Sequence, residues 1–399
     1  MPAASQSVRM LGIARRGRRA LLLGTALQAT SVLVLALPIH PAQAQPAPGA
    51  QPMGGVVVAG TASISRSATA TTIDQATQRA AVNWQSFDVG ARQSVDFQQP
   101  SAQAATLNRV VGPNPSQIAG RITANGQVIL QNQDGITFYK GAQVNTAGFL
   151  ATAAVITNRN FMAGRMVFDQ PAAAGARIEN QGHITVRDAG LAALVAPQVA
   201  NSGVITARLG RVVLAGAKTY ALDLYGDGLV SIDVNGAVTQ VPVGPDGKPV
   251  AALVTNSGTI VAAGGVVELT AREAAGLVQN LVTAGGTIAA PTVGAKTGEI
   301  LLNGIGGSIV VAGRLLANGR TPGEQGGQIE IAPDGGVSLA ATARLEASGA
   351  AGGGVIALGT TLNRARGGPG VTPAMTSQSV TVARGARIAA DATVKGDGG

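Results

Sequence analysis

The sequence predicts an all-β protein, a right-handed parallel β-helix (solenoid) with an N-terminal β cap and protruding loops or hairpins. Three observations support this fold class. Short apolar runs alternate with Asn-Gly or Asp-Gly turns and leave no room for helices. Loosely similar segments recur about every 20 to 30 residues. The composition, with 56 Gly and only 3% aromatic residues, suits layers of small aliphatic side chains better than a globular core.

Residues 1–44 have the layout of a secretory signal peptide: arginines, then an apolar segment over 20–38, then a small-residue cleavage site at Ala42 and Ala44. A membrane anchor is the alternative, but polar residues inside the apolar segment favour cleavage after Ala44. Five of the 29 basic residues and none of the 20 acidic residues lie in this segment, so the net charge of +9 is mostly a targeting feature. With no basic run interleaved with aromatics downstream, the charge does not indicate nucleic-acid binding.

Residues 45–54 are rich in proline and lack periodicity, which predicts a disordered lead. A strand pattern starts at Val56, and residues 56–111 are expected to form the cap that covers the open end of the solenoid. Trp84 and Phe87 are the expected anchors of this cap.

Residues 112–145 hold the most regular alternation of strands and turns. The expected turns are at Asn114-Pro115, at Asn125-Gly126 and at Asn132 to Gly135, because these residue types tolerate the backbone angles of tight turns. The apolar runs between them predict the core of the first coils, made of Ile118, Ile122, Val128, Leu130, Ile136 and Phe138.

The order of motifs resembles the two-partner secretion domain at the N-terminus of filamentous haemagglutinin-like exoproteins. The motifs are Val82-Asn83-Trp84, Val95-Asp96-Phe97, Leu107-Asn108-Arg109 and the two turn regions at 112–120 and 125–138, and the resemblance covers residues 55–160. Two departures stand out: Gln133 occupies the position of the family's Pro, and the second Asn-Pro turn is present only as Asn114-Pro115-Ser116. The resemblance implies export through a dedicated outer-membrane β-barrel transporter, with the turns presenting or nucleating the first coils.

Residues 161–399 are expected to continue the β-helix, with loops at about 219–250 and 361–379. Asn180, Asn201 and Asn256 begin similar turns, where they could form a hydrogen-bonded ladder between coils or act as ordinary turn formers. Residues 112–399 predict on the order of a dozen coils. Because no cap is evident at the C-terminal end, the sequence indicates a truncated or short member of its class.

Catalytic chemistry finds little support. Beyond the signal segment the single histidine is His183, without a suggestive Ser or acid nearby. Asp223, Asp227 and Asp233, near Lys218 and Tyr220, could supply the acid and base of a polysaccharide-acting enzyme or form a solvated hairpin face. Cysteine is absent, no metal-ligand spacing occurs, and the Gly-rich pairs precede strands rather than helices, so no metal, cofactor or nucleotide is expected.

These observations predict a non-enzymatic exoprotein of a Gram-negative bacterium, secreted or held at the cell surface after passing through the periplasm. Its expected partners are the transporter and a host or neighbouring-cell receptor or glycan, with no nucleic acid. An adhesin acting in cell attachment is the favoured role. The alternatives are a β-helical polysaccharide-acting enzyme and the N-terminal part of a haemolysin or contact-dependent toxin.

Overall fold

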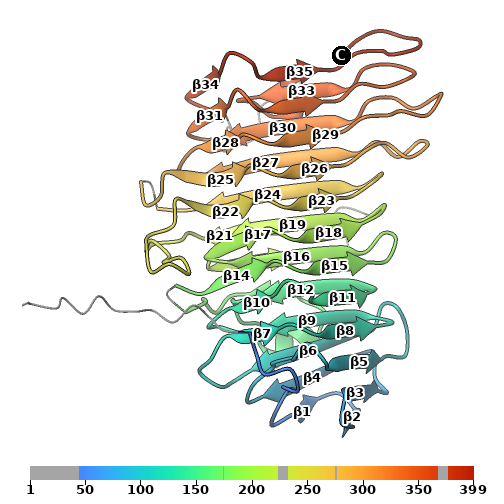
Figure 1. The fold of residues 1–399 in the computed structure, drawn as a ribbon, viewed down its shortest axis with the longest axis vertical. Helices are drawn as coiled ribbons and strands as arrows, with labels where there is room; N and C mark the ends of the chain where they lie inside the picture. Colours follow the sequence, from blue (N-terminus) through green and yellow to red (C-terminus); the bar gives the residue numbers. More distant parts are fainter. Residues whose placement is uncertain (1–44, 174, 223–231, 275, 367–375) are drawn as a thin grey trace, which may run out of the picture. The chain divides into compact units, whose positions relative to one another are not determined.

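The computed structural model describes residues 45–173, 175–222, 232–274, 276–366 and 376–399, which form a stack of β-coils (Figure 1). Each full coil contributes one strand to each of three long sheets, which contain eleven, nine and twelve strands. Strands of neighbouring coils pair in parallel, as in the pairs β7–β10, β8–β11 and β9–β12. The predicted all-β fold class and the β-helix are confirmed.

The eleven-stranded sheet contains β1 (Val56–Ala59), β4 (Arg79–Trp84), β6 (Ala105–Val110), β9 (Gln127–Gln131), β12 (Gly148–Thr152), β16 (Leu191–Ala196), β19 (Arg211–Gly216), β24 (Val266–Arg272), β27 (Glu299–Ile305), β30 (Gln328–Pro333) and β33 (Val355–Leu358). The nine-stranded sheet contains β7 (Ser116–Ile118), β10 (Ile136–Phe138), β14 (Arg177–Asn180), β17 (Gln198–Asn201), β22 (Ala252–Asn256), β25 (Asn280–Ala284), β28 (Ile309–Val311), β31 (Gly336–Leu339) and β34 (Ser379–Val382). The twelve-stranded sheet contains β2 (Ala62–Arg66), β3 (Ala70–Gln75), β5 (Ser94–Gln98), β8 (Arg121–Ala124), β11 (Gln143–Thr146), β15 (His183–Val186), β18 (Val204–Ala207), β23 (Thr259–Val261), β26 (Thr287–Ala289), β29 (Arg314–Leu316), β32 (Arg344–Glu346) and β35 (Arg387–Ala389).

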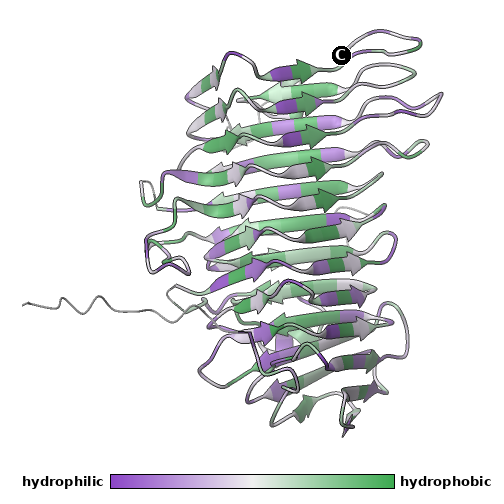
Figure 2. Ribbon diagram, viewed as in Figure 1, coloured by the Kyte–Doolittle hydropathy of each residue, from purple (hydrophilic) through white to green (hydrophobic). Residues whose placement is uncertain are grey.

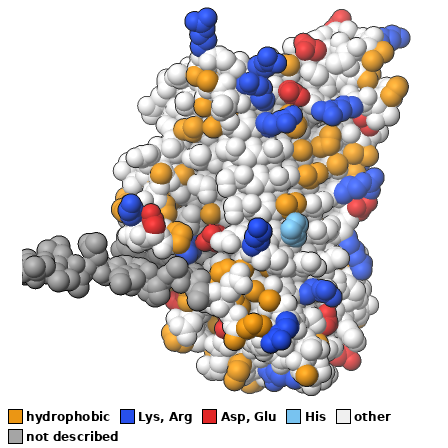
Figure 3. All heavy atoms as spheres, in the orientation of Figure 1, with side chains coloured by type: hydrophobic (Ala, Val, Ile, Leu, Met, Phe, Trp, Pro, Cys, Tyr) orange, Lys and Arg blue, Asp and Glu red, His pale blue; other side chains and the backbone are white. Residues whose placement is uncertain are grey.

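Side chains alternate between the interior of the coils and solvent, as the period of a strand requires. Ile122, Val144 and Ile184 stack in register along one interior column of the twelve-stranded sheet. Figure 2 shows the resulting apolar positions along the strands of every coil. The outward positions, among them exposed His183, form part of the surface in Figure 3. All six residues predicted as the core of the first coils are buried, so that prediction is confirmed: Ile118, Ile122, Val128, Leu130, Ile136 and Phe138.

An asparagine ladder crosses three coils inside the nine-stranded sheet. The Asn180 Nδ2 donates to Asn201 Oδ1 at 2.7 Å, and the Asn201 Nδ2 donates to Asn256 Oδ1 at 2.7 Å. Asn180 also accepts a hydrogen bond from the Gly182 N–H within its own turn. Of the two alternatives that the sequence left open, the ladder is present, and Asn180 also acts as a turn former.

The N-terminal end is closed by two antiparallel pairings, β1 with β4 and β2 with β3. The parallel pairing already begins at β3–β5 and β4–β6, so the cap is smaller than the predicted span of 56–111.

Residues 45–54 differ from the disordered lead that the sequence predicts. The Met53 N–H donates to Ser86 O at 2.9 Å, and the Gly90 N–H donates to Ala50 O at 2.9 Å. A Cβ on Gly90 would lie 2.3 Å from Ala47 O, so the glycine permits this close approach. The segment is held by backbone pairing with residues distant in sequence, which its local composition does not reveal.

Segments that leave the coils form a second apolar core on the outer face of the eleven-stranded sheet. They include α1 (Asn158–Met162) and a lateral sheet of β13 (Val167–Phe168), β20 (Thr219–Leu222) and β21 (Ile232–Gly236). Phe161, Phe168 and Tyr220 are buried there against side chains such as Leu150 and Val195.

The antiparallel pair β20–β21 agrees with the protrusion predicted at 219–250. The segment between β12 and β14, which holds α1 and β13 and is called the excursion below, was not predicted. The short helix α2 (Leu362–Ala365) lies in the loop predicted at 361–379. Such excursions consume chain, so the nine-stranded sheet has nine coil positions where the sequence predicted about a dozen.

Candidate functional site

The motif turn at Asn132 lies against the segment Asn114–Ser116 of the preceding coil. The Asn132 Nδ2 donates to Asn114 O and to Ser116 Oγ, both at 3.0 Å. The Ser116 N–H in turn donates to Gly135 O at 3.0 Å. Because Asn132 is only 1% exposed, these bonds are shielded from water and fasten the first two full coils together.

The turn from Asn132 to Gly135 depends on both of its end residues. The Asn132 Oδ1 accepts from the Asp134 N–H at 3.0 Å, and Asn132 O accepts from the Gly135 N–H at 3.1 Å. Gly135 has φ of +110°, and a Cβ there would lie 2.4 Å from Arg177 O in the next coil. Only glycine satisfies both the backbone angle and this close approach.

Gln133, at the family's proline position, is exposed, and its Nε2 donates to Pro171 O at 3.2 Å. The Gln133 carbonyl accepts from the Ala173 N–H at 3.2 Å. This residue therefore fastens the end of the excursion that contains α1 to the motif turn, a contact to Pro171 that a proline side chain could not make.

The motif turn at Asn125-Gly126 is hydrogen-bonded to Gln99 in the preceding coil. The Asn125 side chain accepts from the Gln99 N–H at 2.7 Å and donates to Gln99 O at 2.6 Å. The Gly126 N–H donates to Gln99 Oε1 at 2.9 Å, and a Cβ on Gly126 would lie 2.6 Å from Ala104 O. Of the predicted turn residues, Asn114 and Pro115 instead lie in the chain leading to β7, and Asn114 contributes its carbonyl to Asn132.

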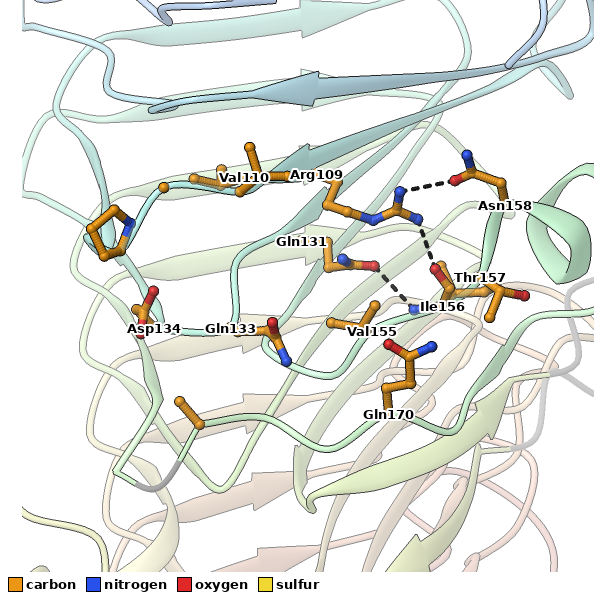
Figure 4. Close-up of a pocket in the computed structure, with 14 residues that line it drawn as sticks. Arg109, Val110, Gln131, Gln133, Asp134, Val155, Ile156, Thr157, Asn158 and Gln170 are labelled. Atoms are coloured by element: carbon orange, nitrogen blue, oxygen red, sulfur yellow. Dashed lines mark hydrogen bonds between the residues drawn. The ribbon is translucent and has the colours of Figure 1, made fainter. Parts of the chain in front are cut away.

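A cavity of about 770 Å³ opens beside these turns (Figure 4). Its lining comes from the end of β6 and the chain after it, from the end of β9 and the motif turn, and from both ends of the excursion that contains α1. The lining residues are Arg109, Val110, Val111, Gly112, Pro113, Gln131, Gln133, Asp134, Val155, Ile156, Thr157, Asn158, Gln170 and Ala173.

Arg109 connects the cavity wall to the excursion. Its guanidinium donates to Ile156 O at 2.7 Å and to Asn158 Oδ1 at 2.9 Å, as Figure 4 shows. Burial lowers the pKa of this arginine from its ordinary value. In the sequence, Arg109 stood out only as part of the Leu107-Asn108-Arg109 motif. A charged residue inside an apolar strand could have indicated that its side chain has hydrogen-bond partners within the protein.

Trp84 and Phe87 are buried near the N-terminal end, with ring centroids 5.5 Å apart in an edge-to-face arrangement. The Trp84 Nε1 donates to Asn108 Oδ1 at 3.0 Å, which explains the buried asparagine in the Leu107-Asn108-Arg109 motif.

The residues considered for catalysis are not gathered into one site by the described structure. Asp223 and Asp227, like the cleavage residues Ala42 and Ala44, lie outside the described residues. Asp233 belongs to β21, and Tyr220 is 1% exposed, stacked on Phe168 with ring centroids 4.5 Å apart.

Of the residues named near these aspartates, Tyr220 has its ring buried by the lateral sheet. The Nζ of half-buried Lys218 donates to Thr239 Oγ1 at 2.6 Å.

Within the ranges described above, no group of three or more His, Cys, Asp or Glu side chains is arranged to hold a metal ion. Among these same residues, no helix has the length and apolar character needed to cross a membrane.

Comparisons with known proteins place residues 49–316 under a family model described as the TPS secretion domain. This range extends well beyond the 55–160 indicated by the sequence motifs. Among solved structures, the HMW1 secretion domain from Haemophilus influenzae matches with a TM-score of 0.69 and 29% identity, covering 84% of this chain and 83% of that one.

Two curated relatives, both heme/hemopexin-binding proteins of Haemophilus influenzae, match the chain over shorter segments. The one from strain Rd is 46% identical over 101 residues, which are 25% of this chain and 11% of the relative. The other is 48% identical over 81 residues, which are 20% of this chain and 9% of the relative. The matched part thus spans about a tenth of the length of these relatives.

Proposed function

Because the chain belongs to the TPS secretion domain family, as its resemblance to haemagglutinin-like exoproteins implied, we propose that it leaves the cell through a dedicated outer-membrane β-barrel transporter. The carrying observation is the contact of the Asn132 turn with the segment Asn114–Ser116 at the start of the full coils. The route is through the periplasm of a Gram-negative bacterium to the cell surface or medium, after removal of residues 1–44.

In this proposal the contact between the Asn132 turn and the segment Asn114–Ser116 nucleates folding outside the cell. The earliest coils have the fewest neighbours on which to bury their apolar faces, so they are the costliest to form. The hydrogen bonds from Asn132 to Asn114 and Ser116 link two coils, and only a few residues must become ordered for these bonds to form. Later coils then add by burying one layer of aliphatic side chains each, which opposes return of the chain to the periplasm.

We propose attachment to cells as the biological role and no catalytic activity. Support comes from the haemagglutinin-like architecture and from the names of the matched proteins, which describe secretion or binding. The polysaccharide-acting alternative gains nothing from Tyr220, which is buried. Binding of haem or haemopexin is a property named for relatives that match over a tenth of their length, and it is not proposed for this chain.

The test is export of a C-terminally tagged chain in the native host with and without the candidate transporter. Wild type is expected outside the cell only when the transporter is present, and Asn132→Ala is expected to accumulate in the periplasm. Asn145→Ala, at an exposed outward position of β11, is the matched control and should be exported normally. Export of wild type without the transporter would refute the route.

A second pair of variants separates the effect of a steric clash with the next coil from the effect of backbone strain. Gly135 and Gly141 both have positive φ, but a Cβ meets Arg177 O at 2.4 Å only at Gly135 and meets nothing within 4 Å at Gly141. Gly135→Ala should therefore be exported much less than Gly141→Ala. Refolding of the purified variants shows whether the loss reflects slow nucleation; equal export of both would contradict the proposed role of this turn.

A further inference from the structure

Three arginines form a column on the outward face of the twelve-stranded sheet. Arg314 of β29 pairs in register with Arg344 of β32, and Arg344 pairs with Arg387 of β35. Parallel register places successive residues about 4.8 Å apart along the stack. Figure 3 shows Lys and Arg side chains over the upper coils, with Asp and Glu side chains among them and further Lys and Arg side chains lower on the visible face.

The middle arginine is held in place by the backbone around it. The Arg344 Nη1 donates to Ala343 O at 2.7 Å and to Gly385 O at 3.0 Å. Arg314 and Arg387, on either side, are exposed, and exposed Arg384 lies just before β35. The column therefore combines one fixed guanidinium with cations that are open to solvent.

No acidic side chain of the described residues forms an ion pair with Arg314, Arg344 or Arg387. Glu346, the acid nearest in β32, accepts instead from the Asn318 Nδ2 at 3.1 Å. Elsewhere the protein does pair outward arginines, as in Arg211 with Glu268. Like charges directly opposite one another in a sheet are destabilising, so this column costs stability unless an anion bridges it.

We propose that Arg314, Arg344 and Arg387 bind a linear acidic polysaccharide that lies along the stack of coils. The guanidinium fork suits sulfate and carboxylate groups, which it can bind through two hydrogen bonds at once. A polymer with an anionic group on successive sugars can occupy successive coils. Aromatic platforms for stacking bases are absent from the exposed large apolar residues that the structure describes, which favours a glycan over single-stranded nucleic acid.

This inference rests on the attachment role proposed above and specifies the chemistry of one ligand. It does not depend on the export route, because it concerns the folded chain. Failure of glycan binding would leave transporter-dependent export untouched, and failure of export would leave the binding of purified protein untouched.

The experiment measures binding of purified wild type to heparin oligosaccharides, polygalacturonate, neutral dextran and poly(dT) at several salt concentrations. The first two probes distinguish sulfated from carboxylated glycans. We expect binding to at least one of them, weakened by salt, and none to dextran. Replacing all three arginines by glutamine should weaken binding roughly tenfold, as expected for three exposed charge pairs, and should reduce the salt dependence.

The matched control removes the same charge elsewhere, through Arg92→Gln, Lys140→Gln and Arg187→Gln at exposed positions. It should retain nearly all binding. Thr287 pairs in register with Arg314, so Thr287→Arg extends the column by one coil and should tighten binding. Equal losses in the arginine variant and the control, binding to neither acidic glycan, or tighter binding to poly(dT) would each overturn the proposal.

Discussion

Replacement of Asn201 by valine is expected to destabilise the fold by about 2–4 kcal/mol. Valine has a similar size and suits a strand, so the change mainly removes hydrogen bonds. It leaves Asn256 Oδ1 without its partner and deprives Asn180 Nδ2 of its 2.7 Å bond, although Asn180 keeps a weaker contact to Gly182 O at 3.4 Å. Each buried polar atom that loses its partner costs about 1–3 kcal/mol, and together these give the expected range.

The measurement is denaturant unfolding of the purified mature protein, with equal slopes required before free energies are compared. Asn145→Val, on the exposed face of β11, is the control and should change stability by less than about 0.5 kcal/mol. Replacing Asn180, Asn201 and Asn256 together by valine should cost clearly less than three times the single change, because no ladder partner remains unsatisfied and the main further loss is the bond from the Gly182 N–H to Asn180. A single variant as stable as the control, or a triple variant that costs three times the single one, would refute the ladder's energetic role.

Two further predictions concern the outer face of the eleven-stranded sheet and the excursion. Burial raises the pKa of Glu299 above its ordinary 4.5, so the folded state binds the proton more tightly than the unfolded chain and Glu299 destabilises the fold at pH above its folded pKa. Glu299→Gln should raise the denaturation midpoint near neutral pH by an amount that shrinks on acidification; a gain independent of pH would contradict this assignment. Arg109→Gln should detach the excursion and speed amide exchange at Phe161 several-fold while the coils stay protected, whereas exposed Arg159→Gln should not.

Local sequence carried most of the fold because a β-helix repeats one local pattern. The runs around Ile122, Val128 and Ile136 could be read as interior positions from their spacing between glycine-ended turns, and all three are buried. The ladder could be anticipated because Asn180 and Asn201 begin similar turns 21 residues apart. The segment 45–54 could not be predicted in this way, since its partners near Ser86 and Gly90 are recognised only by backbone pairing.

The candidate site was predicted in part. Asn132 and Gly135 were identifiable as turn residues, because asparagine and glycine tolerate the backbone angles that the turn requires. That Asn132 also reaches Asn114 and Ser116 follows from the length of the intervening coil, which brings residues 16 and 18 positions apart into contact. The role of Arg109 was not predicted, because its partners at 156 and 158 belong to an excursion without a periodic pattern.

By itself, the sequence determined the fold class, the turn from Asn132 to Gly135 and the interior residues of the first coils, since each depends on the preferences of a few neighbouring residues. Only the tertiary structure decided which residues of neighbouring coils lie next to one another. Segments of unequal length separate the coils, and the one between Arg344 and Arg387 holds α2. The register that joins Arg314, Arg344 and Arg387 therefore emerges only once each strand has found its neighbour. Contacts between coils join residues that are distant in sequence, and their pairing is set by the burial of complete layers rather than by local preference.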